Sequence, residues 1–88
     1  MADEIHVSVV TADGTAFEQN TSCVNLPTGG GSVGVLADHA PMLCAISAGV
    51  VRCTAADGSA VHVTVGEGIA SVADNEVVLL VSEAQTTE

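Results

Sequence analysis

The sequence predicts an all-β fold, a β-sandwich or flattened barrel of about ten short strands. Hydrophobic residues make up 48% of the 88 residues, but Phe17 is the only aromatic one, so aliphatic side chains must build the core. Valine is the most frequent of these, and β-branched side chains favour strands. Apolar and polar residues alternate over short segments that Asp-Gly and Asp-Asn pairs separate, and no segment has a helical period.

The first strands follow directly from this alternation. Residues 5–9 are expected to form an opening strand with one solvent-exposed face, and the Asp13-Gly14 pair to form a tight turn. The second strand carries Phe17, which we expect to anchor the core. Residues 22–26 alternate again, and Pro27, which has no backbone N–H, is expected to end that strand.

The remaining strands are expected at residues 33–35, 42–46, 50–55, 61–65, 69–73 and 77–81. Both sets of alternating residues in 42–46 are fairly apolar, which predicts a strand covered on both faces. Residues 66–68 (Gly-Glu-Gly) indicate a bulge or sharp bend. The continuous apolar run 77–81 indicates either a central strand or a strand with one face on a partner protein.

The chain is expected to form one domain, residues 1–83, followed by a short polar tail, residues 84–88. Residues 82–88 are polar, and chain ends of this kind commonly fray. Between two of the strands, residues 38–41 break the apolar pattern, because Pro41 pushes the residue before it out of the helical region. This segment therefore predicts a rigid polar corner.

The charge of the chain excludes several classes of function. The formal net charge is −10, with no lysine and a single arginine, Arg52. Nucleic-acid binding needs clustered basic residues, and an anionic membrane surface would repel this chain. No apolar run approaches the roughly 18–20 residues of a membrane span, so no direct membrane insertion is expected. Asp3 and Glu4 are unlike the start of a signal peptide.

Cofactor, metal and thiol chemistry have weak signals. The loop Gly29, Gly30, Gly31 and Ser32 lacks the lysine of a phosphate-binding loop and precedes a strand, so no nucleotide or other cofactor is expected there. The three histidines are singletons without the paired spacing of a zinc site. The three cysteines are odd in number and form no C-x-x-C pair, which indicates reduced thiols in an intracellular protein.

One stretch carries a family resemblance. It reads G-V-L-A-D-H-A-P-M-L-C-A-I from residue 34, followed by Gly49-Val50-Val51-Arg52. This pattern resembles the epsilon subunit of F-type ATP synthase. Four further segments resemble the same family and occur in the same order as in that family. They are the opening I-H-V-S-V-V-T-A-D-G-T-A-F, the segment C-V-N-L-P-T-G-G-G-S-V-G-V-L, the segment V-G-E-G-I-A-S-V and the closing N-E-V-V-L-L.

The resemblance implies the family's N-terminal β-sandwich and a non-catalytic role in the rotor. A subunit of this kind binds the gamma subunit, rests on the c-ring and couples ion translocation to ATP synthesis by the remaining F1 subunits. It lies peripherally on the cytoplasmic side of the energy-coupling membrane. By position, Gly29, Gly30, Gly31 and Ser32 match the family's ring-facing loop, and Thr11, His39 and Cys44 match its gamma-facing surface.

The chain departs from the family pattern in two places. Many relatives carry an acidic residue where Ser32 stands, so a charge-based ring contact is not expected. The chain stops at Glu88, before the two C-terminal helices that family members usually have, so neither a C-terminal helical domain nor inhibition by it is expected. Two other functions remain open: a free-standing β-sandwich adaptor that docks through residues 77–81, and a small enzyme that uses His39 and Cys44.

Overall fold

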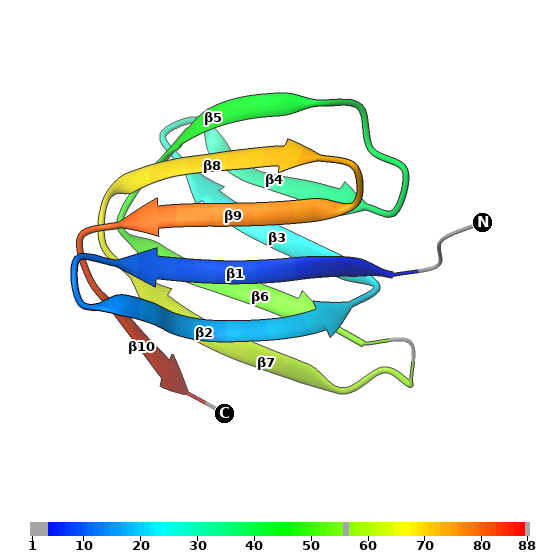
Figure 1. The fold of residues 1–88 in the computed structure, drawn as a ribbon, viewed down its shortest axis with the longest axis horizontal. Coiled ribbons are helices and arrows are strands. Elements are labelled where there is room, and N and C mark those ends of the chain that lie inside the picture. Colours follow the sequence, from blue (N-terminus) through cyan, green and yellow to red (C-terminus); the bar gives the residue numbers. More distant parts are fainter. Residues whose placement is uncertain (1–3, 56, 88) are drawn as a thin grey trace.

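The computed structural model describes residues 4–55 and 57–87 and consists of two stacked β-sheets (Figure 1). The strands are β1 (Ile5–Thr11), β2 (Gly14–Thr21), β3 (Cys23–Thr28), β4 (Gly31–Leu36), β5 (Met42–Ile46), β6 (Gly49–Thr54), β7 (Ala60–Val65), β8 (Gly68–Ala73), β9 (Glu76–Val81) and β10 (Ala84–Thr87). Sheet A has the order β2-β1-β9-β8-β5, and sheet B has the order β10-β7-β6-β3-β4. No described residue lies in a helix. The predicted ten-stranded β-sandwich is therefore confirmed.

The core lies between the sheets and is almost entirely aliphatic, as the composition predicts. Its buried hydrophobic residues are Ile5, Val7, Val9, Val24, Leu26, Val35, Ile46, Val51, Cys53, Val63, Val65, Ala70, Val72, Val77, Leu79 and Val81. Phe17 is only half-buried and packs against the edge of this cluster. Full burial of one valine or leucine side chain stabilises the fold by about 1.5–3 kcal/mol, so aliphatic packing accounts for the sandwich without aromatic residues.

The turns follow the predicted chemistry. Asp74 and Asn75 join β8 to β9 with φ angles of 53° and 62°, the left-handed pair that a two-residue hairpin of matching twist requires. Asp38 also has a left-handed φ of 65°, within the predicted polar corner between β4 and β5. Aspartate and asparagine tolerate this region better than most residues. The corner and the hairpin turns are confirmed.

Strand β9 is the centre of sheet A, as its apolar run predicts. It pairs in parallel with β1 on one side and antiparallel with β8 on the other. The chain crosses from sheet B to sheet A at Gly66 and Glu67 and returns at Ser82 and Glu83. Two backbone hydrogen bonds of 2.9 Å join the crossings, from Gly66 N–H to the Glu83 carbonyl and from Ser82 N–H to the Glu67 carbonyl. The predicted sharp bend is thus confirmed.

Three expectations from the sequence are wrong. Pro27 does not end β3, which continues to Thr28 and pairs with β4 throughout. On its other side, β3 pairs with β6 only as far as Asn25, so the missing N–H of Pro27 removes no hydrogen bond between strands. Strand β5 is not covered on both faces, because it is an edge strand and Leu43 is 71% exposed. Residues 84–87 are not a frayed tail but form β10, which pairs with β7 while Ala84 packs against the core.

Candidate interaction surface

The structure distributes the three expected gamma-facing residues along sheet A. Thr11 ends β1, and its hydroxyl accepts a hydrogen bond of 3.2 Å from the Asp13 N–H. His39 lies in the corner at the opposite end of the sheet. The neighbouring Asp38 N–H donates a hydrogen bond to the side-chain oxygen of Asn75, the residue before β9, so the corner lies next to the start of β9. Cys44 lies midway along β5, opposite Ala70, and is half-buried against the core. They do not form one cluster, and their role stays a prediction.

The polar corner holds His39 in a defined orientation. The His39 Nδ1–H donates to the Ala40 carbonyl at 2.7 Å, and the Asn75 amide donates to the Asp38 carboxylate at 3.3 Å. A carbonyl can only accept, so Nδ1 carries the proton. A shallow hollow of about 250 Å³ lies here, lined by Asp38, His39, Pro41, Asp74 and Asn75. The corner is therefore a preformed polar surface feature.

The enzyme alternative gains no geometric support from His39 and Cys44. In the described part of the chain no hydrogen bond joins them, and the His39 Nδ1–H is already used by its own loop. A nucleophile and its base need to lie within hydrogen-bond reach of each other. Among residues 4–55 and 57–87, no three His, Cys, Asp or Glu side chains lie together as metal ligands would.

The expected ring-facing loop is the tip of the β3–β4 hairpin. Gly29, Gly30, Gly31 and Ser32 are all exposed, and Gly31 has a left-handed φ of 124°. The Thr28 hydroxyl donates to the Gly31 carbonyl at 2.6 Å and closes the turn. Figure 1 shows this tip at the same end of the sandwich as the β1–β2 turn, opposite the polar corner. A contact with the c-ring stays a prediction.

The outer face of sheet A carries an exposed apolar surface, of which the sequence indicates only the part in residues 77–81. Leu43, Leu80 and Ile69 are 71%, 50% and 45% exposed. Leu80 lies opposite Ile69 across β9 and β8, so the side chains are neighbours on one face. We call this surface the sheet A patch; its members are Val10, Leu43, Ala45, Ile69, Val78 and Leu80.

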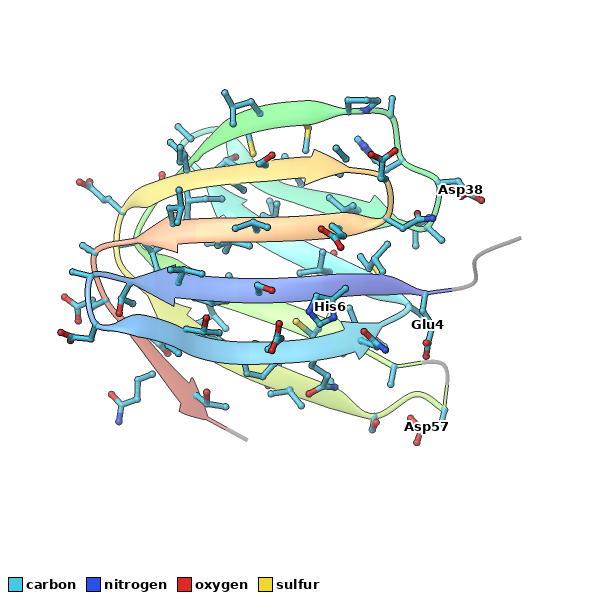
Figure 2. All side chains as sticks on the ribbon, in the orientation of Figure 1. Glu4, His6, Asp38 and Asp57 are labelled. Carbon is cyan, nitrogen blue, oxygen red and sulfur yellow. The ribbon has the colours of Figure 1, made fainter. Side chains whose placement is uncertain are left out.

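A charged cluster lies on the same face, on β1, β2 and β9. The two ring nitrogens of His6 lie 2.8 Å from a Glu18 carboxylate oxygen and 2.7 Å from the Asn20 side-chain oxygen. The hydrogen bonds to Asn20 and Glu18 raise the pKa of His6, and the charges of Glu18 and Glu76 add to this. Figure 2 shows His6 on the outer face of sheet A, between β1 and β2.

The sequence model of one protein family matches almost the whole chain. Its description is ATP synthase, Delta/Epsilon chain, beta-sandwich domain, and it matches residues 4–87. The chain belongs to this family. The predicted resemblance is therefore confirmed, and the observed sandwich is the fold that the family description states.

Curated relatives agree with this assignment. The chain is 42% identical over 82 residues to the ATP synthase epsilon chain of a Synechococcus species, and 33% identical over 88 residues to that of Desulfitobacterium hafniense. These matches cover 93% and 100% of this chain but 59% and 66% of the relatives. The chain thus spans about three fifths to two thirds of the relatives' length.

Two solved structures share the fold at low sequence identity. A chain of the Euglena gracilis mitochondrial ATP synthase, in the assembly of OSCP, F1 and c-ring, has a TM-score of 0.88 at 20% identity. The match covers 98% of this chain and 55% of that one. A chain of the Tetrahymena thermophila mitochondrial ATP synthase central stalk and c-ring has a TM-score of 0.70 at 16% identity, covering 92% and 65%. Within the described residues, no helix is long and apolar enough to cross a membrane.

Proposed function

We propose that this chain is a non-catalytic rotor subunit of an F-type ATP synthase. It binds the gamma subunit and rests on the c-ring, so that ion translocation through the ring turns the stalk and drives ATP synthesis in the remaining F1 subunits. The observation that carries this proposal is the family match over residues 4–87, together with relatives named ATP synthase epsilon chain. The role needs no cofactor of its own.

We propose the sheet A patch as the docking surface for the gamma subunit. Contiguous exposed apolar surface on a small protein marks an interaction site more often than scattered apolar residues do. Leu80 and Ile69 are neighbours on the adjacent strands β9 and β8, near the end of the sheet where Thr11 lies, and His39 lies at the other end. Half-exposed leucine and isoleucine side chains gain stabilisation when a partner covers them, which favours a stable complex.

We propose that the β3–β4 hairpin tip contacts the c-ring. Its exposed residues Gly29, Gly30, Gly31 and Ser32 carry no charge and only one side-chain hydrogen-bonding group, the Ser32 hydroxyl. Small residues let another backbone approach closely, so the contact depends on shape and backbone hydrogen bonds rather than on an ion pair. The subunit then lies peripherally on the cytoplasmic side of the membrane, within the complex.

Reconstitution tests this proposal. The chain is mixed with the cognate gamma subunit, the complex is isolated, and ATP-driven proton pumping is measured in vesicles that contain an ATP synthase depleted of its own epsilon subunit. We expect a stable gamma complex and restored pumping. A matched comparison replaces Gly30 by Glu in the hairpin tip, which should leave the gamma complex intact and lower pumping.

A second candidate is an adaptor in another assembly, because the outward residues Val78 and Leu80 of β9 fit any apolar partner. Failure to form a gamma complex at micromolar concentration would favour this candidate and would contradict the rotor role. The family match would then describe the fold alone.

A further inference from the structure

The acidic side chains of this protein are distributed unevenly between its two sheets. Of the acidic residues that the structure describes, only Glu18 and Glu76 lie within strands, and both belong to sheet A. The others lie in turns and connections: Glu4, Asp13, Asp38, Asp57, Glu67, Asp74 and Glu83. The strands of sheet B carry no carboxylate, and β6 in that sheet holds Arg52. The negative charge of the strands therefore lies on sheet A.

Both glutamates point to the outer face, beside the sheet A patch. Glu76 pairs with His6 across β9 and β1, and Glu18 pairs with Ser8 across β2 and β1. Glu76 precedes Val78 by two residues on the same strand, a spacing of about 7 Å. A partner that covers Val78 and Leu80 must therefore also approach Glu76.

We propose that Glu18 and Glu76 are a charge-recognition element of the docking face, and that the partner presents a basic side chain to them next to an apolar strip. This inference rests on the proposed function, in which the partner is the gamma subunit. A neutral or acidic partner surface would desolvate two carboxylates without compensation, which is unfavourable. A lysine or arginine opposite them fixes the register of the contact and accelerates the encounter.

His6 modulates this element. In the observed arrangement both of its ring nitrogens face oxygen atoms, of Glu18 and Asn20, which suits the doubly protonated ring. The charged groups that face His6 from the neighbouring strands are Glu18 on β2 and Glu76 on β9. A protonated His6 competes with the partner's cation, whereas a neutral His6 leaves both carboxylates available. Association with a basic partner therefore strengthens as the pH rises through the titration of His6.

Association kinetics with the isolated gamma subunit test the inference. The test protein carries Glu18→Gln and Glu76→Gln. The control carries Asp57→Asn and Glu83→Gln, which change the net charge equally but lie in the β6–β7 turn and the β9–β10 connection. We expect the test pair to slow association about tenfold at low salt and to weaken its salt dependence, and the control pair to change the rate less than about twofold. A third protein, His6→Asn, should lose most of the increase in rate with pH.

The outcomes separate this inference from the proposed function. If the unaltered chain binds gamma but both charge pairs slow association equally, the effect is one of net charge and the recognition element is refuted. If the unaltered chain does not bind gamma, the proposed function fails and the inference fails with it. Far-ultraviolet circular dichroism of each variant shows whether the fold is retained.

Discussion

Replacing Gly68 by alanine should damage the fold at a point where its two sheets are joined. Gly68 opens β8 and pairs with Val81 of β9 and Ile46 of β5. An added Cβ would overlap the carbonyl oxygen of Leu80 and lie 2.7 Å from the Val81 Cα and 2.8 Å from the Leu80 carbonyl carbon. These obstacles are all backbone atoms of the central strand of sheet A, so relief requires β8 and β9 to separate.

The expected loss follows from this geometry. Overpacking of a well-packed site costs about 1–3 kcal/mol, and a clash with backbone belongs at the upper end. A loss of about 3 kcal/mol is large against the roughly 4–13 kcal/mol of total stability expected for a domain of this size. It corresponds to a fall in Tm of roughly 12–24 °C.

Two other glycines provide matched controls. At Gly66 the nearest atom to an added Cβ is the Ser82 hydroxyl oxygen, a side-chain atom that can rotate away, so Gly66→Ala should lose about 1 kcal/mol. At Gly30 no atom lies within 4 Å and φ is not left-handed, so Gly30→Ala should leave stability unchanged or raise it by about 0.4–1 kcal/mol.

Urea unfolding followed by far-ultraviolet circular dichroism measures these differences, since the chain has no tryptophan or tyrosine for fluorescence. The reasoning is refuted if Gly68→Ala unfolds within about 0.5 kcal/mol of the unaltered chain, the range of ordinary surface substitutions. It is equally refuted if Gly30→Ala is as destabilising as Gly68→Ala.

Three further predictions concern single side chains. Thr21→Val removes a fully buried hydroxyl that donates a hydrogen bond of 2.6 Å to the Thr54 carbonyl. Urea unfolding should show that the free energy of unfolding falls by about 1 kcal/mol, and an unchanged free energy would mean that this hydrogen bond does not stabilise the fold. Burial raises the pKa of Cys53 to about 11, so a thiol reagent should label it only after unfolding; rapid labelling in the native state would contradict its burial. The hydrogen bonds of His6 to Asn20 and Glu18 raise its pKa, so they make a small contribution to stability when His6 is protonated. This contribution is fully present below the ordinary histidine pKa of about 6.5 and is lost as the pH rises through the pKa of His6 in the folded state. Over that pH range, the Tm of the unaltered chain should fall, whereas the Tm of His6→Asn should not.

Much of the fold follows from local sequence patterns. Alternating residues, such as Ile5, Val7 and Val9, identify the buried side of a strand because the side-chain period of a strand is two. The Asp74-Asn75 pair marks a hairpin because both residues tolerate left-handed backbone. The apolar run of residues 77–81 indicates a central strand, and β9 lies between β1 and β8. These features depend on residues close in sequence, and the structure confirms them.

Features that depend on distant pairing were not predictable in this way. The parallel pairing of β1 with β9 joins segments from opposite ends of the chain, and no local pattern specifies it. Strand β10 is polar, and only its pairing with β7 and the packing of the partly buried Ala84 against the core reveal it. Pro27 does not end β3, because a missing N–H matters only where a partner strand lies on that side, and the sequence does not show which strand lies there.

The candidate surface was predictable only in part, for the same reason. Leu43 and Ile69 look like core residues in the sequence, and only the edge position of β5 and the facing of β8 expose them. His6 and Glu18 are 12 residues apart, and the β1–β2 hairpin brings them together. The Asp13-Gly14 turn indicates that these two residues lie close together, because the position of a hairpin turn sets which residues of its strands lie opposite each other.

The most direct test of the docking account compares two equally exposed positions on opposite faces. Leu80 on sheet A is 50% exposed and Val50 on sheet B is 49% exposed. Leu80→Asp should weaken binding to the cognate gamma subunit about 30-fold or more, as expected when an apolar contact of the interface is replaced by a buried carboxylate. Val50→Asp should change the Kd less than about twofold, because a residue outside the interface contributes little. Titration calorimetry measures both, and weaker binding by Val50→Asp with no effect of Leu80→Asp would contradict the proposal that sheet A is the docking face.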